Sequence, residues 1–204
     1  MKRLFNKIVF LVILMVAVPV IAQDATPDAL IKSTVDEVIA VLKQDDGIRE
    51  GNQDKVLGLI REKILPHFNF TRMTQLAMGK NWSLAAPEQK KSLVREFRTL
   101  LVRTYSNSLT NYRDEVIKVG AAHVDPQDKR ATVKTQVIQG GGKQPVPIDY
   151  SMEKRGDSWR VYDVTVAGVS LVTNYRGTFN SQIRNGGVDG LIATLVEKNH
   201  SNAE

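Results

Sequence analysis

The spacing of apolar residues along this chain changes from helical to strand-like near Tyr112 and back to helical near Leu171. Before Tyr112, apolar residues recur every three or four positions, as they do on the buried face of an amphipathic helix. Between Val116 and Val166 they alternate with polar residues, which is typical of strands with one buried face. Helices, then strands, then helices in a chain of 204 residues predict an α+β fold.

Residues that begin or end helices mark out the helical stretches. Asn52 can cap one helix through its side-chain oxygen, and Pro66 cannot continue that helix. Pro87 suits the first turn of a long helix, and the pair Gly186-Gly187 stops the last helix but one. Helices are therefore expected at about 27–42, 52–66, 68–78, 87–112, 171–185 and 188–196.

Four strand candidates lie in the middle of the chain, at 116–124, 130–139, 146–155 and 158–166. The segments between them are short and rich in turn-forming residues: Asp125-Pro126-Gln127-Asp128, Gly140-Gly141-Gly142 and Gly156-Asp157. Short turns join neighbouring antiparallel strands. We therefore expect a four-stranded antiparallel sheet, with the helices before and after it laid on one face.

The last strand candidate, 158–166, alternates less regularly than the others. Trp159 and Val161 follow one phase, whereas Tyr162, Val164 and Val166 follow the other. Both faces are then partly apolar, which is typical of a strand covered on both sides. Alternation alone does not assign the side of this strand that faces a pocket.

Residues 1–22 have the three-part pattern of a secretory signal peptide. Three basic residues precede an uncharged apolar run of about 11 residues, and Pro19 and Ala22 follow it. The run is shorter than the roughly 20 residues that span a bilayer, although a retained membrane anchor is the alternative. We expect cleavage after Ala22 and a single domain over 23–204. A secreted chain with no cysteine fits a Gram-negative periplasm better than a disulfide-rich extracellular setting.

Composition excludes several classes of function. Without cysteine, and with its three histidines far apart at His67, His123 and His200, the chain is not expected to form a thiolate or multi-histidine metal site. The net charge is +6, and it falls to +3 once the three basic residues of the signal peptide are removed. Such a weak field does not suit a nucleic-acid binder. We expect no metal, no cofactor and no nucleic-acid partner.

Two residues are candidates for catalysis, and each also has a structural interpretation. Ser170 lies between a strand and a helix, as in a nucleophile elbow, but Val172 replaces the final glycine of that motif. The alternative is that Ser170 caps the helix. Asp163 interrupts an apolar strand and could be a general base in an apolar pocket, or could hold an arginine or the amides of a loop. A small hydrolase or isomerase that acts on an apolar substrate is therefore the alternative function.

A cluster of aromatic and methionine side chains precedes the long helix, at Phe68, Phe70, Met73, Leu76 and Met78. Such residues most often fill a core. They also line cavities that adapt to flexible apolar ligands. Composition does not distinguish a filled core from a cavity.

Two blocks near the C-terminal end stand out: Trp159–Val164 with Gly168–Arg176, and Gly186–Leu191. They resemble the signature of the MlaC family of periplasmic phospholipid-binding proteins, and the similarity extends over about 29–197. The resemblance implies a carrier that helps to maintain outer-membrane lipid asymmetry and has no catalytic residues. Its implied partners are phospholipid, an outer-membrane lipoprotein–porin complex, and an inner-membrane ABC transporter with an MCE-domain ring.

A carrier of this kind must bury two acyl tails. At about 0.8 kcal/mol per methylene, two tails of about 15 methylenes represent roughly 24 kcal/mol, which a shallow groove could not offset. We therefore expect the tails in a dry cavity between sheet and helices, with the charged head outside. Alternation and helical phase predict a lining of Val133, Val137, Ile148, Tyr150, Met152, Val164 and Val166 from the strands, with Phe97, Leu101, Tyr105, Val169 and Val172 from the flanking segments.

Overall fold

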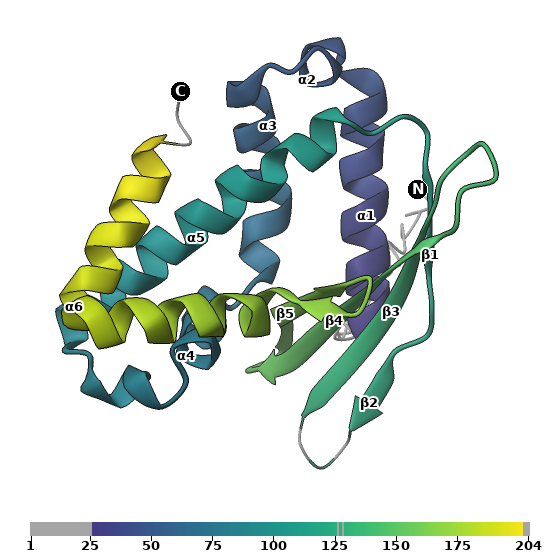
Figure 1. The fold of residues 1–204 in the computed structure, drawn as a ribbon. Coiled ribbons are helices and arrows are strands. Elements are labelled where there is room, and N and C mark those ends of the chain that lie inside the picture. The colour runs from purple at the N-terminus through teal and green to yellow at the C-terminus, as the bar shows by residue number, and fades with distance from the viewer. Residues whose placement is uncertain (1–25, 126, 128, 202–204) are drawn as a thin grey trace, which may run out of the picture.

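The computed structural model describes residues 26–125, 127 and 129–201 (Figure 1). The expected signal peptide, 1–22, lies outside the described residues. Of the helices in the described part, none is both long enough and apolar enough to cross a membrane.

The first helices begin behind residues whose side chains cap them. α1 (Pro27–Gln44) starts behind Thr26, whose hydroxyl accepts a hydrogen bond from the amide of Ala29, and a short α2 (Asp46–Arg49) follows. α3 (Gln53–Leu59) is capped by Asn52, as predicted. It then widens into a π-helical turn, η1 (Ile60–Ile64), and ends in a 3₁₀ turn, η2 (Leu65–His67), that contains Pro66. The π-helical turn was not expected from the sequence.

Two further helices complete the segment before the sheet. α4 (Phe70–Met78) is capped by Asn69 and ends at Gly79, and the 3₁₀ segment η3 (Gly79–Leu84) leads onwards. α5 (Pro87–Thr110) is the long helix that Pro87 predicted. It crosses the middle of the helical layer in Figure 1.

The sheet is antiparallel, as predicted, but the described residues contribute six strands to it and not four. β3 (Arg130–Ile138), β4 (Val146–Arg155) and β5 (Ser158–Val166) form its centre. The first strand candidate divides into β1 (Val116–Val119) and β2 (His123–Asp125), which both pair with β3. The two-residue strand β6 (Val169–Ser170) adds an edge beside β5.

A β-bulge explains the irregular alternation of β5. Ser151 of β4 pairs with Asp163, whereas the next residue, Met152, pairs with Val161, so Tyr162 has no partner in the register. The extra residue shifts the phase of the strand. Trp159, Val161 and Val164 consequently belong to one buried cluster. The interpretation of β5 as a strand covered on both sides is therefore wrong.

The chain ends in α6 (Leu171–Ser201), which is bent at Gly187. Gly187 has φ 66° and ψ −166°, a backbone conformation that is essentially restricted to glycine. The helix break expected at Gly186-Gly187 is confirmed. The segment after the bend packs along α5, where Asn199 donates to the backbone carbonyl of Glu96 at 3.0 Å.

The helices lie on one side of the sheet, as Figure 1 shows. Three buried clusters hold the layers together: one between α4, α5 and α6, one between α1 and the sheet, and one between α1, α2 and α3. The fold is α+β, as predicted. Its buried clusters surround, but do not fill, the space between the sheet and α5.

Candidate ligand-binding cavities

A cavity of about 580 Å³ lies between the sheet and α5 and is called the larger cavity here. Its wall is almost entirely apolar. The segment from η1 to α4 and the helix α5 form one side, and the strands and the start of α6 form the other. The lining residues are Ile60, Ile64, Leu65, Phe68, Phe70, Met73, Leu101, Val102, Tyr105, Ser106, Ser108, Leu109, Ile148, Tyr150, Val164, Val166, Val169, Leu171 and Asn174.

The larger cavity opens to solvent between α5 and β6. Four of its lining residues are exposed there: Tyr105, Ser108, Val169 and Asn174. Tyr105 is 39% exposed and Val169 is 56% exposed. These four residues are called the mouth. A ligand in the larger cavity would have its buried part against the sheet and its outer end at the mouth.

A second cavity of about 210 Å³, the smaller cavity, lies deeper, between α1 and the sheet. It shares four wall residues with the larger cavity: Ile64, Phe68, Leu109 and Tyr150. No residue that lines it is exposed. Its own lining consists of Ile31, Thr34, Val35, Val38, Ile39, Leu42, His67, Tyr112, Ile117 and Val161.

Two other hollows, of about 360 and 500 Å³, lie beside α2. Charged and polar side chains such as Asp46, Arg49 and Lys55 line most of their surfaces. An apolar ligand would gain little by entering them. The larger and smaller cavities are therefore the candidate site.

Three hydroxyl groups in the cavity walls bond to the protein itself. Ser106 donates to the carbonyl of Arg103 at 3.1 Å, Thr34 to that of Leu30 at 2.8 Å, and Tyr112 to that of Glu115 at 3.2 Å. A wall hydroxyl that is already bonded does not need a polar partner from a ligand. The interior therefore suits hydrocarbon.

Burial also keeps the titratable wall residues uncharged. It raises the pKa of Tyr150, and the hydrogen bond with Thr135 opposes this rise without cancelling it. The pKa of His67 is lowered by burial and by the nearby Arg160, whereas Glu37 acts in the opposite direction. At neutral pH both side chains are neutral, so neither cavity contains a charge from these groups.

Seven of the residues predicted from the sequence line the larger cavity. They come from three separate parts of the chain and surround a common space: Leu101 and Tyr105 on α5, Ile148 and Tyr150 on β4, Val164 and Val166 on β5, and Val169 on β6. Tyr150 also lines the smaller cavity. Whether these side chains contact a ligand remains a prediction.

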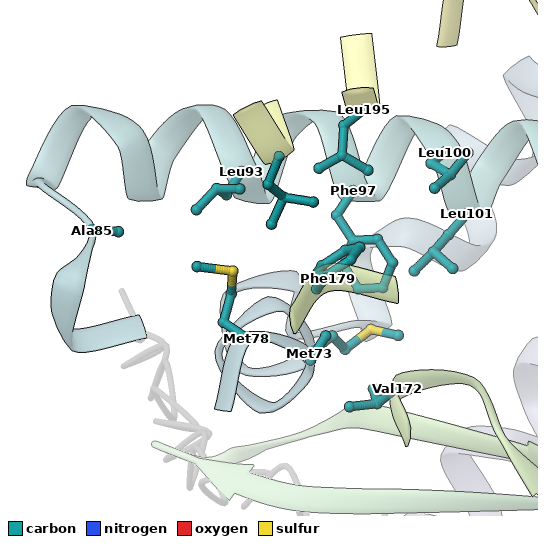
Figure 2. Close-up of a cluster of buried hydrophobic side chains, with 12 residues drawn as sticks. Met73, Met78, Ala85, Leu93, Phe97, Leu100, Leu101, Val172, Phe179 and Leu195 are labelled. Atoms are coloured by element: carbon teal, nitrogen blue, oxygen red, sulfur yellow. The ribbon is translucent and has the colours of Figure 1, made fainter. Parts of the chain in front are cut away.

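The other five predicted residues line neither cavity. Phe97 and Val172 belong to the cluster between α4, α5 and α6 (Figure 2), where the ring centroid of Phe97 lies 5.0 Å from that of Phe179. Val133 and Met152 face the helices, but α1 covers that part of the sheet directly, so both are fully buried. Val137 is half-buried near the end of β3. Helical phase and alternation identified the inward faces but not the places where a neighbouring element fills the space.

Several cavity residues were missed by the sequence prediction. The π-helical turn η1 contributes Ile60 and Ile64, and no local signal in the sequence predicted that turn. Leu109 could have been found, because it lies four residues after Tyr105 on the same face of α5. The aromatic and methionine cluster divides: Phe68, Phe70 and Met73 line the larger cavity, whereas Leu76 and Met78 do not.

Asp163 and Ser170 form a cap for α6. The Asp163 carboxylate accepts hydrogen bonds from the Ser170 hydroxyl at 2.5 Å and from the amide of Val172 at 3.1 Å. Ser170 in turn accepts from the amide of Thr173 at 3.0 Å. These bonds satisfy amides at the start of the helix that have no partner within it. The geometry therefore agrees with the structural alternative for each residue: Ser170 caps the helix, and Asp163 holds a backbone amide.

The described residues contain no group of three or more histidine, cysteine, aspartate or glutamate side chains that could hold a metal ion. The fold and the site thus define an α+β protein with an apolar interior that is open at one mouth. Enclosed apolar pockets with few polar groups are typical of proteins that bind small apolar molecules.

Comparison with known proteins places the chain in a family. Residues 32–197 match the family described as MlaC protein, and the chain belongs to the MlaC family. It is 21% identical to the intermembrane phospholipid transport system binding protein MlaC of Haemophilus influenzae over 203 residues, which cover 97% of this chain and 93% of that protein. It is 26% identical to the toluene tolerance protein ttg2D of Pseudomonas putida, over 88% of this chain and 83% of that one.

A solved structure is also similar. The phospholipid-binding protein from Ralstonia solanacearum, in complex with a phospholipid, has 37% sequence identity to this chain and a TM-score of 0.79. The match covers 89% of this chain and 99% of that one. The family expected from the sequence motifs is confirmed.

Proposed function

We propose that this chain is a periplasmic phospholipid carrier. It binds a glycerophospholipid with both acyl tails in the two apolar cavities and the charged head group outside the mouth. The observation that carries this proposal is the apolar interior between sheet and α5, which is open to solvent at one place. The phospholipid in the Ralstonia solanacearum structure and the names of the relatives support the class of ligand.

The energetics support tails inside and a head group outside. Hydrocarbon that leaves a membrane needs compensation of about 0.8 kcal/mol per methylene, and an enclosed apolar wall can provide it. A charged phosphate would lose its hydration in either cavity, where the wall hydroxyls are already bonded. The mouth offers Ser108, Asn174 and the exposed Tyr105 at the boundary with water.

The seven predicted residues on the larger cavity are proposed as tail contacts. Transport between an outer-membrane lipoprotein–porin complex and an inner-membrane ABC transporter with an MCE-domain ring belongs to the same proposal, on the strength of the family. A periplasmic location is part of the same proposal, and the expected signal peptide and the intermembrane transport system named for the Haemophilus influenzae relative support it. No enzymatic step is proposed, because Asp163 and Ser170 are engaged in capping α6.

The test is to identify what the protein carries. The chain is purified without detergent from a Gram-negative host, denatured and extracted, and the extract is analysed by mass spectrometry. We expect near-stoichiometric phospholipid. Ile148→Asp places a carboxylate on the wall of the larger cavity and should lower the retained lipid at least about tenfold, because an unpaired charge is costly in an apolar site.

Val124→Asp is the matched control. Val124 lies on β2, is 41% exposed and lines neither cavity, so this variant should keep its lipid. Circular dichroism establishes that both variants are folded. Recovery of no phospholipid from the unmodified protein, or equal retention by the folded Ile148→Asp and Val124→Asp variants, would contradict the proposal.

A further inference from the structure

The two cavities differ in size and in access. The larger has a volume of about 580 Å³ and the smaller about 210 Å³. Ile64, Phe68, Leu109 and Tyr150 line both, so these four side chains form the wall between them. Only the larger cavity has exposed lining residues. A chain that extends from the larger cavity into the smaller one would pass between these four side chains.

The volumes decide how much hydrocarbon each cavity can hold. The larger cavity has nearly three times the volume of the smaller one, about 580 against about 210 Å³. The greater part of two tails of about 15 methylenes each therefore has room only in the larger cavity. The smaller cavity adjoins it at the four shared side chains and has room for the end of one tail.

The smaller cavity suits the methyl end of a tail and nothing more polar. Apart from Thr34, which is bonded to Leu30, and the neutral His67, its own lining is apolar or, at Tyr112, bonded to the backbone. Half-buried side chains of α1 and β1, Val35 and Ile117, form part of its wall and do not line the larger cavity. A wall that closes the space limits the length of chain that fits.

We infer that the smaller cavity sets the acyl-chain length that this protein accepts, by receiving the end of one of the two tails. The inference rests on the proposed function and extends it from the class of ligand to its selectivity. Filling the smaller cavity should shift the bound lipid to shorter tails. Enlarging it should shift the bound lipid to longer tails.

The experiment uses the lipid-free protein and mixed vesicles. Lipid is removed in denaturant, and the refolded protein is incubated with vesicles of dimyristoyl, dipalmitoyl and distearoyl phosphatidylglycerol in equal amounts. The bound fraction is then analysed by mass spectrometry. Val35→Phe should raise the ratio of dimyristoyl to distearoyl lipid about fifteenfold over the unmodified protein, since excluding two methylenes forfeits roughly 1.6 kcal/mol. Val35→Ala should change the ratio in the opposite direction.

Two further variants make the result decisive. Val124→Phe places the same change on an exposed residue outside both cavities and should leave the ratio unchanged. Ile117→Phe fills the smaller cavity from the sheet side. It replaces Val35→Phe as the cavity-filling variant if Val35→Phe does not fold. An unmodified protein that takes up no lipid overturns the proposed function. Lipid uptake with the same chain-length ratio in the unmodified protein, the cavity-filling variant and Val35→Ala overturns this inference alone.

Discussion

Replacing Asp163 with alanine is expected to lower the free energy of unfolding by about 2–3 kcal/mol. Its carboxylate accepts three hydrogen bonds, from the amide of Val164 at 2.9 Å, the amide of Val172 at 3.1 Å and the hydroxyl of Ser170 at 2.5 Å. The amide of Val172 lies in the first turn of α6 and has no acceptor within the helix. Alanine therefore leaves it without its partner.

The magnitude follows from what each variant removes. A donor left without a partner costs about 1–3 kcal/mol, and the partial burial of Asp163 places each loss near the lower end of that range. Asp163→Asn keeps one acceptor oxygen and loses the charge beside the helix N-terminus, which is worth about 0.3–1 kcal/mol. Ser170→Ala removes the acceptor of the Thr173 amide and should cost about 1 kcal/mol or somewhat more.

The assay is urea unfolding followed by circular dichroism for the two alanine variants, Asp163→Asn and the double alanine variant. Because Asp163 and Ser170 bond to each other, their effects should be non-additive by about 1 kcal/mol. Additive effects, or Asp163→Ala within about 0.5 kcal/mol of the unmodified protein, would refute the capping account. Retained lipid in the folded variants would separate this structural role from any catalytic one.

Two other regions give predictions of the same kind. Gly187→Ala should lower the free energy of unfolding, measured with urea, by about 1–3 kcal/mol, because the backbone conformation of Gly187 excludes a side chain. Gly186→Ala is the control and should leave the free energy of unfolding unchanged or slightly raise it. Equal losses of stability in the two variants would contradict this explanation. The pKa of His67 is lowered by burial and by Arg160, so below its ordinary value of 6.5 the unfolded chain takes up the proton first and stability falls. His67→Gln should remove that part of the acid destabilisation between about pH 7 and pH 5, and identical pH profiles of the two proteins would rule it out.

Most of the fold follows from local signals in the sequence. Asn52, Pro87 and Gly187 lie at helix boundaries because each has a stereochemical reason to be there, and such reasons act over a few residues. The number of strands could not be predicted from such local signals. The segment between β1 and β2 keeps an apolar character, so its alternation did not reveal that pairing is interrupted there; only the hydrogen bonds to β3 show it.

The cavity was harder to predict than the sheet beside it. Alternation shows that Val133 and Ile148 face the helices, but not that α1 covers the first while open space lies beside the second. That difference depends on how α1 and α5 diverge over the sheet, which no local spacing encodes. The seven lining residues that were identified lie where α5, β4, β5 and β6 meet around the larger cavity.

The unpaired Tyr162 makes the length of β5 as important as its composition. Side chains on a regular strand alternate strictly, so Trp159 and Val161 share a face with Val164 and Val166 only because the bulge adds one residue between the two pairs. Removing Tyr162 would leave a regular ladder with these four side chains still on one face. Removing Thr165 would instead place Val164 and Val166 on opposite faces, so a single-codon deletion there should be tolerated much worse than a deletion of Tyr162.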